Sequence, residues 1–345
     1  MKRLSAKMKK MNTLVVGQGI AGSLVAFMLY LDKIPFKVID PANANTSSLI
    51  AAGMFTPIGG KRKTIHPAAF QQIPFAIKIY KQIEQLLGTT ILHLHNVYQV
   101  YNSLEEKNEL IGKLANMDFA KYILSNTRAL PYVKQEWGAF EITHSGWVDC
   151  GLLIAGFARW LRQNDSLIEA AFSYEDLELG DGEMEYQGRK FNNIIFCEGW
   201  LAINNPFFHM ENIIPCKGDI LTIKYDHPVS GHIIKKNGIY LIPTGNDMFK
   251  AGSTYHWNNN NAQPGEADKK LLEDQLDAML EKKYITIDHK SAIRPTTQNR
   301  EVIARQHPQH KGMFMLNGLG TKGVLQGPWW AQQVVKLLAK RDDLF

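Results

Sequence analysis

The residues best suited to chemistry begin with three glycines, Gly17, Gly19 and Gly22, in a G-x-G-x-x-G pattern. The pattern follows a short apolar run and opens a helical one, which is the context in which it binds dinucleotides. Gly17 permits a tight turn, Gly19 lets the backbone approach a diphosphate, and Gly22 lets the helix pack closely on the strand. Free amides at the helix start, with the positive end of its dipole, bind phosphate without a cationic side chain. These glycines predict a dinucleotide-binding turn.

A carboxylate stands where the ribose of such a dinucleotide would lie. Asp40 closes the second apolar run, 18 residues after Gly22, and can accept hydrogen bonds from the hydroxyls of the adenosine ribose. The same negative charge disfavours a 2′-phosphate, so NADP is the dinucleotide that the sequence favours least.

Two further segments distinguish NAD from FAD. Residues 46–57 (TSSLIAAGMFTP) follow the second strand, and residues 316–324 (LNGLGTKGV) combine a strand, a glycine-rich turn and a helix start. A second helix N-terminus of this kind can face the pyrimidine edge of a flavin, where negative charge builds up on reduction. Each segment alone is typical of an ordinary glycine-rich turn, but together they favour FAD.

The elements that must position these residues follow from hydrophobic periodicity. Asn12–Val16 and Phe36–Asp40 are predicted strands on either side of a helix over Ile20–Leu31, which makes a βαβ unit. Two further helices and two further buried strands are predicted at Pro67–Leu87, Gly323–Leu338, Asn192–Cys197 and Met313–Asn317.

The middle of the chain has a different pattern, in which short apolar runs with hairpin-type spacers predict a large antiparallel sheet. Its strands are expected at Ile91–Tyr101, Ala139–Thr143, Ile213–Lys224, His232–Ile234, Ile239–Ile242 and Phe249–Gly252. We therefore predict an α/β (α+β composite) fold, with a Rossmann-like FAD-binding domain interleaved with an antiparallel-sheet domain. The FAD-binding domain is expected over residues 11–57, 145–212 and 290–340, and the second domain over 58–144 and 213–289.

Composition excludes several other classes of protein. The chain of 345 residues is 45% hydrophobic and 21% charged, which argues against disorder and fibrous repeats. Its net charge of +6 is concentrated in residues 1–10, a basic and flexible leader, so the nearly neutral remainder argues against a nucleic-acid partner. The longest apolar run, Leu24–Leu31, is too short to span a membrane. Since the three cysteines (Cys150, Cys197 and Cys216) form no C-x-x-C motif, we expect a soluble cytoplasmic protein without disulfides.

Seven segments together resemble the D-amino-acid-oxidase type of FAD-dependent oxidoreductases, particularly glycine oxidase and its relatives. They are GQGIAG (17–22), SSLIAAGMFTP (47–57), IIFCEGW (194–200), IPCKGDIL (214–221), YLIPTGNDMFKAGST (240–254), SAIRPTTQNR (291–300) and NGLGTKGV (317–324). Their order and spacing match the family from residue 11 to residue 338. The resemblance implies that FAD lies extended between a nucleotide domain and a substrate domain built on the antiparallel sheet.

The resemblance also implies a set of cofactor-binding residues. They are Gly17, Gly19, Ile20, Ala21, Gly22, Asp40, Pro41, Ser48, Ala51, Ala52, Gly53, Met54, Glu198, Gly199, Trp200, Arg294, Gly318, Gly320, Thr321, Lys322, Gly323 and Val324. Cys216 matches no motif for covalent flavin attachment, so FAD is expected to bind non-covalently. His93 and His95 share one face of a predicted strand but lack a third ligand nearby in sequence, so no metal site is expected.

The implied reaction is the oxidation of a small amine, usually an amino acid or N-alkyl amino acid, to an imine by hydride transfer to flavin N5. The protein's main task is then to orient the substrate and hold its amine neutral. Arg294 matches the family's arginine for the substrate carboxylate, which a planar guanidinium binds in a bidentate manner. Tyr240 matches the tyrosine that closes over substrate in glycine oxidase. The electron acceptor, O2 or another molecule, and the oligomeric state stay open.

This sequence departs from the family pattern in three places. The turn Gly320–Gly323 carries Lys322 but lacks the arginine of glycine oxidase, Gln298 and Asn299 replace a usual acid, and Cys197–Gly199 (CEG) replaces Ala-Ala-Gly. These departures leave the substrate open and keep two alternatives. One is a tRNA-modifying flavoenzyme, like the oxidase half of the bifunctional methylaminomethyluridine enzyme, and the other is a FAD-binding protein without catalytic activity.

Overall fold

The computed structural model describes residues 12–43, 46–60, 62–124, 129–180, 182–227, 229 and 231–341. The predicted basic leader, residues 1–10, lies outside this part of the chain. In the described ranges, no helix is both long enough and apolar enough to cross a membrane.

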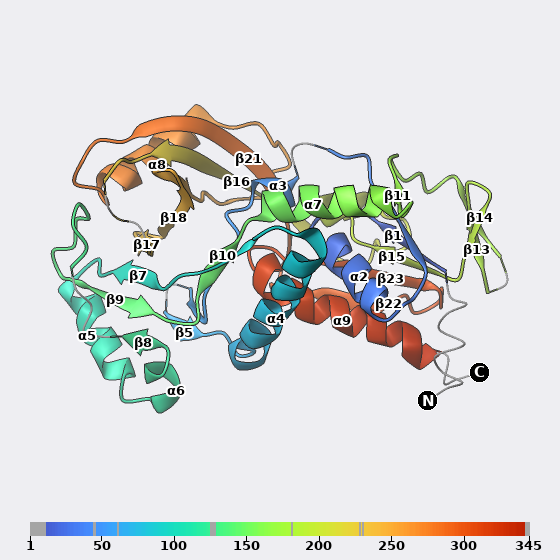
Figure 1. Cartoon of the computed structure of the whole chain (residues 1–345), viewed down its shortest axis with the longest axis horizontal. Helices are drawn as coiled ribbons and strands as arrows, with labels where there is room; N and C mark the ends of the chain where they lie inside the picture. Colours follow the sequence, from blue (N-terminus) through green and yellow to red (C-terminus); the bar gives the residue numbers. More distant parts are fainter. Residues whose placement is uncertain are drawn as a thin grey trace.

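A six-stranded sheet is assembled from the start, the middle and the end of the chain (Figure 1). Its strands, in spatial order, are β11 (Leu167–Ile168), β2 (Phe36–Ile39), β1 (Thr13–Val16), β15 (Asn193–Phe196), β23 (Met313–Asn317) and β22 (Ile303–Gln306). Neighbouring strands are parallel, except that β22 runs antiparallel to β23. The strands predicted at β1, β2, β15 and β23 are therefore confirmed to within a residue at each end.

Alternate residues of these strands face two apolar layers, as the period of two requires. Val15, Ile195 and Phe314 share a core with four helices, which are α2 (Ile20–Leu31), α4 (Ala69–Leu87), α7 (Cys150–Gln163) and α9 (Gly323–Arg341). Leu14 and Ile194 face the other way, toward the small sheet of β12 (Leu177–Leu179), β13 (Met184–Tyr186) and β14 (Arg189–Phe191). The helices predicted at α2, α4 and α9 are confirmed, whereas α7 had no prediction.

The second sheet has nine strands. They are β7 (Val97–Val100), β8 (Ile123–Leu124), β9 (Ala139–Ile142), β16 (Ile213–Lys224), β17 (Ile233–Lys236), β18 (Ile239–Gly245), β19 (Met248–Gly252), β20 (His256–Trp257) and β21 (Ile285–Thr297). The long strand β16 pairs with β19 and β20 along one edge and with β21 along the other. Pairing is antiparallel, as predicted, apart from the parallel pair β7 and β17. Strand β21 had no prediction.

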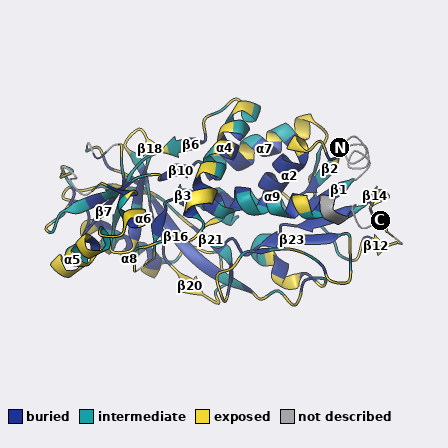
Figure 2. Ribbon diagram, turned by 90° about the horizontal axis from the view of Figure 1, so that it is seen from below, coloured by how far each residue is buried: buried dark blue, intermediate teal, exposed yellow. Residues whose placement is uncertain are grey.

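Shorter elements connect and cover the two sheets. They are α3 (Ser47–Ile50), β3 (Met54–Phe55), β4 (Ile58–Gly59), β5 (Thr64–Ile65), β6 (Leu92–Leu94), α5 (Leu104–Lys113), α6 (Met117–Ala120), β10 (Gly146–Val148), η1 (Gly199–Asn204) and α8 (Glu266–Asp277). Leu272 and Leu276 of α8 pack on one face of the nine-stranded sheet, and Leu110 of α5 packs on the other. Figure 2 shows that α5 is largely exposed, whereas α2 and α9 are mostly buried along their inner sides.

One predicted strand is wrong. The run Ile91–Tyr101 is interrupted after Leu94 and forms two strands, β6 and β7, that belong to different sheets. The imidazole of His95 is hydrogen-bonded to the carbonyl oxygen of Gly231 at 3.1 Å, and Asn96 donates to Glu141 at 2.8 Å. These two polar side chains mark the corner where the chain leaves one sheet and joins the other.

Candidate functional site

The turn between β1 and α2 is closed by glycines at close contacts. Gly17 has a left-handed backbone (φ 97°), and a Cβ atom there would lie 2.6 Å from the carbonyl oxygen of Cys197. A Cβ atom at Gly22 would lie 1.8 Å from the carbonyl oxygen of Gly17. The first turn of α2 therefore sits directly on the strand-to-helix turn, which explains both glycines by packing.

The first turn of α2 contains backbone N–H groups that have no hydrogen-bond acceptor among the described residues. Its N-cap residue, Gly19, supplies no side chain, and the Oγ atom of Ser48 on α3 accepts the amide of Ile20 at 2.9 Å instead. Within the described ranges the amides of Ala21 and Gly22 have no acceptor. Free amides at the positive end of a helix dipole form a site suited to an anion.

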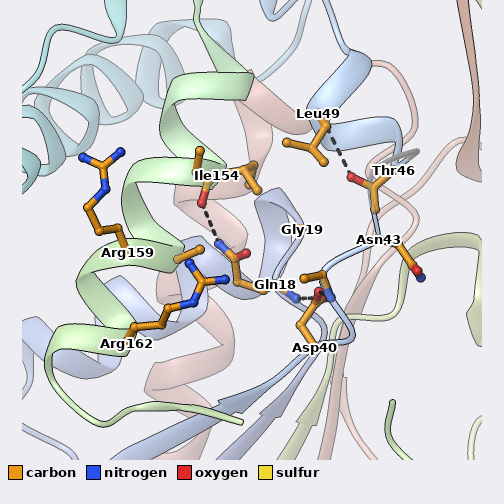
Figure 3. Close-up of a pocket in the computed structure, with 12 residues that line it drawn as sticks. Gln18, Gly19, Asp40, Asn43, Thr46, Leu49, Ile154, Arg159 and Arg162 are labelled. Atoms are coloured by element: carbon orange, nitrogen blue, oxygen red, sulfur yellow. Dashed lines mark hydrogen bonds between the residues drawn. The ribbon is translucent and has the colours of Figure 1, made fainter. Parts of the chain in front are cut away.

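A pocket of about 360 Å³ lies beside this turn (Figure 3). Asp40 stands at its edge, where its Oδ2 accepts the amide of Gln18 at 2.7 Å and its Oδ1 accepts the amide of Ala42 at 2.7 Å. Each carboxylate oxygen keeps a further lone pair. Arg159 and Arg162 of α7 line the opposite wall. The pocket therefore places a fixed carboxylate beside Gln18 and Gly19, the residues that lead into the turn with the free amides.

A second glycine-rich turn, residues 318–323, joins β23 to α9 and meets both α2 and β21. A Cβ atom at Gly323 would lie 3.4 Å from the side chain of Ile20. The amide of Gly320 donates to the carbonyl oxygen of Pro295 at 2.9 Å. This turn thus links the start of α2 to a strand of the other sheet.

The loop that follows α3 contacts β10 of a small three-stranded sheet and β19 of the nine-stranded sheet. Gly53 has a left-handed backbone (φ 74°), and a Cβ atom there would lie 2.0 Å from the carbonyl oxygen of Val148. The carbonyl oxygen of Ala51 accepts a hydrogen bond from Nζ of Lys250, on β19, at 3.3 Å. A positive charge from the nine-stranded sheet is therefore held at this loop.

The guanidinium of Arg294 lies across strand β16. Arg294 is paired in register with Cys216, yet a Cβ atom at Gly218 would lie 2.1 Å from its Nη1 and Nη2 atoms. Nη1 donates to the carbonyl oxygens of Lys217 at 3.4 Å and Thr254 at 3.3 Å. The side chain can cross the strand only because position 218 carries no side chain.

Two tyrosines accompany this arginine. Cζ of Arg294 lies 4.7 Å from the ring centroid of Tyr255, a cation–π contact. Tyr240 is in register with Gly252 and, through it, with Ile220, which shares a side of β16 with Gly218. Burial, reinforced by Tyr255, raises the pKa of Tyr240 to about 12, so its phenol stays neutral. We call the side of the sheet that carries Arg294, Gly218 and Tyr240 the arginine face.

A buried charged cluster occupies the opposite face of β16. Nζ of Lys217 lies 3.0 Å from Oδ1 of Asp219 and 2.8 Å from Oδ2 of Asp268 on α8. His289 contacts Asp219 at 2.8 Å, and His256 is hydrogen-bonded to Asp268. Burial alone would lower the pKa of Lys217, but its hydrogen bonds to Asp268 and Asp219 raise it. We call these five residues, of which only His256 is exposed, the buried cluster. Its Lys217 also supplies one of the two carbonyl oxygens that hold Arg294.

Other predicted site residues have structural partners. Both carboxylate oxygens of Glu198 are engaged, by the hydroxyl of Tyr174 and by Nδ2 of Asn205 at 2.8 Å. Burial raises the pKa of Glu198. The carbonyl oxygen of Gly199 accepts Nδ2 of Asn317 at 2.8 Å, which joins the ends of β15 and β23.

The remaining predicted residues are dispersed around these contacts. Ala52 is buried and Met54 partly buried in the core under the arginine face, and Val324 is buried with its carbonyl oxygen accepting the hydroxyl of Tyr80 at 2.7 Å. Trp200 lies partly buried in η1. The side chains that stay exposed at the rim are those of Pro41, Thr321 and Lys322.

His93 and His95, the two histidines considered as metal ligands from the sequence, each have another partner. His93 stacks on Trp147 with ring centroids 4.3 Å apart, and His95 bonds to the backbone. Across the described ranges no group of three or more His, Cys, Asp or Glu side chains is arranged to hold a metal ion.

Several residues of the site had no role assigned from the sequence. Gly218 had a usable signal, because a glycine inside an otherwise buried strand often marks a close approach by another group. Tyr255 and Lys250 had none, since only the pairing of β19 and β20 with β16 brings them to the arginine face.

Comparison with known families gives one match that spans most of the chain. Residues 12–337 match the family DAO, described as "FAD dependent oxidoreductase". Glycine oxidase from Geobacillus kaustophilus (strain HTA426) is 22% identical over 144 residues, which cover 39% of this chain and 36% of that protein.

Solved structures share the fold across nearly the whole chain. Glycine oxidase from Bacillus cereus ATCC 14579 superposes with a TM-score of 0.82 at 17% identity, covering 96% of each chain. The Geobacillus kaustophilus glycine oxidase gives a TM-score of 0.79 at 18% identity, covering 96% of this chain and 95% of that chain. Iminodiacetate oxidase from Chelativorans sp. BNC1 gives 0.79 at 19% identity, covering 95% of each. At these identities the likeness concerns the fold.

Proposed function

Because this chain belongs to the DAO family of FAD-dependent oxidoreductases, we propose that it oxidises a small amine that carries a carboxylate to the corresponding imine. The substrate class is that of amino acids and N-alkyl amino acids. The observation that carries the proposal is the position of Arg294 across Gly218, on the same face as Tyr240.

Arg294 is suited to bind a carboxylate because its guanidinium is held in place by neighbouring groups but forms no ion pair with a described carboxylate. Two backbone carbonyl oxygens and the ring of Tyr255 hold it in place. No carboxylate of the described residues forms an ion pair with it. A planar cation prepared in this way can bind a substrate carboxylate through two parallel hydrogen bonds, which fixes the direction of the rest of the molecule.

The dinucleotide cradle fits the family's cofactor. The free amides of Ala21 and Gly22 suit a diphosphate, and the remaining lone pairs of Asp40 suit the ribose hydroxyls. The turn 318–323 and the loop around Ala51 lie between this cradle and the arginine face, which is where the flavin ring would be bound. FAD, when bound non-covalently, supplies the two-electron acceptor for a hydride from the carbon next to the amine nitrogen.

Tyr240 and the surrounding charges act on the substrate amine. With a pKa of about 12, the Tyr240 phenol stays protonated, so it donates one hydrogen bond and accepts another. The positive charges of Arg294 and Lys250 disfavour an ammonium group in their vicinity, which favours the neutral amine that oxidation requires. The proton lost from nitrogen as the C=N bond forms passes to solvent.

The test is anaerobic mixing of the FAD-loaded protein with glycine, D- and L-amino acids and their N-methyl derivatives. We expect at least one of them to bleach the absorbance of the oxidised flavin, and its decarboxylated analogue to bleach far more slowly. Arg294→Lys should weaken substrate binding by about 10-fold or more. Arg189→Lys, an exposed change on β14, is the matched control and should leave binding unchanged.

Two results would contradict the proposal. If the protein retains FAD but no compound of the panel bleaches it, a catalytically silent flavoprotein is favoured. If amines with and without a carboxylate react equally well, Arg294 does not bind the substrate carboxylate.

A further inference from the structure

A second cation–aromatic pair stands beside the first on the arginine face. Arg300 follows β21 in a turn in which its amide donates to the carbonyl oxygen of Thr297 at 3.1 Å. Its Cζ atom lies 5.7 Å from the ring centroid of Trp257 on β20. We call Arg294 with Tyr255 the inner pair and Arg300 with Trp257 the outer pair.

The register of the sheet places the two pairs on the same face. Trp257 is the partner of Cys216 on one edge of β16, and Arg294 is its partner on the other. Directly paired residues of adjacent strands project to the same side of a sheet. His256, between the two aromatic residues, turns to the opposite side and bonds to Asp268. The two rings are therefore neighbours, two residues apart along the chain, which corresponds to about 7 Å in extended backbone.

In the part of the chain that the structure describes, Arg294, Arg300 and Lys322 gather here without forming an ion pair. Burial, followed by the charge of Arg300, lowers the pKa of Lys322 in the glycine-rich turn. Burial raises the pKa of the Cys216 thiol, whereas Arg294 and Arg300 both oppose that rise. Arg162 and Arg305, by contrast, pair with Glu169 and Glu211.

No ion pair engages either Arg300 or Lys322 among the described residues. Trp257 and Tyr255 are 43% and 50% exposed, so both pairs lie partly at the surface, within reach of solvent. Lys322 of the last glycine-rich turn is thus within electrostatic range of Arg300, in the turn that follows β21.

We propose that the outer pair, Arg300 on Trp257, together with Lys322, is a second anion-binding position, and that the substrate is an amine with two carboxylates. This inference rests on the proposed function, because Arg294 is taken to hold the first carboxylate. The aromatic ring fixes the Arg300 guanidinium by cation–π attraction and leaves its hydrogen-bond donors free. The class of substrate is an amino dicarboxylate or an N-carboxyalkyl amino acid, in which a short chain of atoms separates the two acid groups.

Binding of unreactive acids to the FAD-loaded protein separates this position from the first one. The probes are succinate and its monoamide, succinamate, followed by calorimetric titration and by the perturbation of the flavin absorbance. We expect succinate to bind about 10-fold or more tightly than succinamate, with the advantage decreasing as salt is added.

The decisive variant is Arg300→Asn. Asparagine tolerates the left-handed backbone that Arg300 adopts (φ 60°), so the turn should be retained. We expect this variant to lose the preference for succinate and to bind succinamate as the wild type does. Arg189→Asn, remote on β14, should behave like the wild type, and Trp257→Leu should give a partial loss.

The outcomes distinguish the two proposals. If succinamate binds and Arg294→Lys abolishes that binding, but succinate gains nothing and Arg300→Asn has no effect, the second position is wrong and the proposed function stands. If neither acid binds to the wild type, the carboxylate role of Arg294 fails, and the inference fails with it.

Discussion

Arg294 occupies the space that a side chain at position 218 would fill. The two residues lie on adjacent strands, and the guanidinium crosses from β21 over β16 at the point where Gly218 leaves a gap. The carbonyl oxygens of Lys217 and Thr254 then fix the end of the side chain. Gly218 thereby sets the position of the cation that we propose to bind the substrate carboxylate.

Gly218→Ala is the direct test of this relationship. The backbone at 218 is not left-handed, so alanine is compatible with the strand, but its Cβ atom must displace the guanidinium. We expect KM for the amine substrate to rise by about 10-fold or more, from the loss of charge-assisted hydrogen bonds, with little change in thermal stability. Steady-state kinetics measure the change in KM, and calorimetry measures the thermal stability. Gly59→Ala, where a Cβ atom meets open space, is the control, and equal KM values in the two variants would refute the arrangement.

Gly22→Ala should affect the cofactor end of the molecule. Its Cβ atom would lie 1.8 Å from the carbonyl oxygen of Gly17, so α2 must move away from the turn and its free amides with it. We expect a loss of about 2–4 kcal/mol in the free energy of unfolding and a reduced ratio of FAD to protein after gel filtration. Gly112→Ala, in the exposed helix α5 with no neighbour within 4 Å, should retain both. Full FAD occupancy in Gly22→Ala would show that the close contact is dispensable.

Removing the ammonium of the buried cluster should destabilise the protein strongly. Lys217→Met leaves Asp219, which is fully buried, and Asp268 without their cation. Breaking a buried pair in this way costs about 3–5 kcal/mol, to be measured by urea unfolding. Lys290→Met removes the exposed ion pair with Asp288 and should cost less than about 1 kcal/mol. Similar losses in the two variants would mean that the cluster is not a unit of stability.

Protonation of His307 at acidic pH should lower the free energy of unfolding. This imidazole is 5% exposed, its Nε2 donates to the carbonyl oxygen of Phe207 at 2.9 Å, and its Nδ1 accepts the amides of Gln309 at 3.1 Å and His310 at 2.9 Å. Both nitrogens are thus committed to the neutral form, and burial lowers the pKa of His307 below its usual 6.5.

The sign of the effect follows from proton binding. Between the lowered pKa and 6.5 the unfolded chain binds more protons than the folded one, so the free energy of unfolding falls as the pH drops through that window. Above pH 6.5 the contribution is fully present. His307→Asn retains an acceptor for the two amides but does not titrate, so its unfolding free energy should differ less between pH 7.5 and pH 5.5 than that of the wild type. An identical difference in both proteins would exclude His307 as the source.

The periodic and local parts of the fold were predictable from the sequence. The βαβ opening, Ile213–Lys224 and Met313–Asn317 each carry a period or a glycine signature that depends on few distant contacts. The run Ile91–Tyr101 was predicted wrongly, because apolar alternation does not reveal that His95 and Asn96 turn the chain into another sheet.

The substrate end of the site depends on pairing between distant strands. Arg294 was identified through a family resemblance, but its path over Gly218 requires the register of β16 with β21. Tyr255 and Trp257 reach the same face through β20. No local sequence pattern specifies such registers, so the contact between Arg300 and Trp257 could be recognised only from the structure.

The order of strands in the six-stranded sheet has a consequence for folding during synthesis on the ribosome. Strand β15 lies between β1 and β23, and β23 ends at residue 317. At the usual rate of about 5–20 residues per second, β15 waits roughly 6–24 s after its own synthesis before that neighbour has been made. During this interval an apolar strand edge is open to pairing with other nascent chains. Protection by chaperones is therefore most valuable while residues 197–317 are being translated.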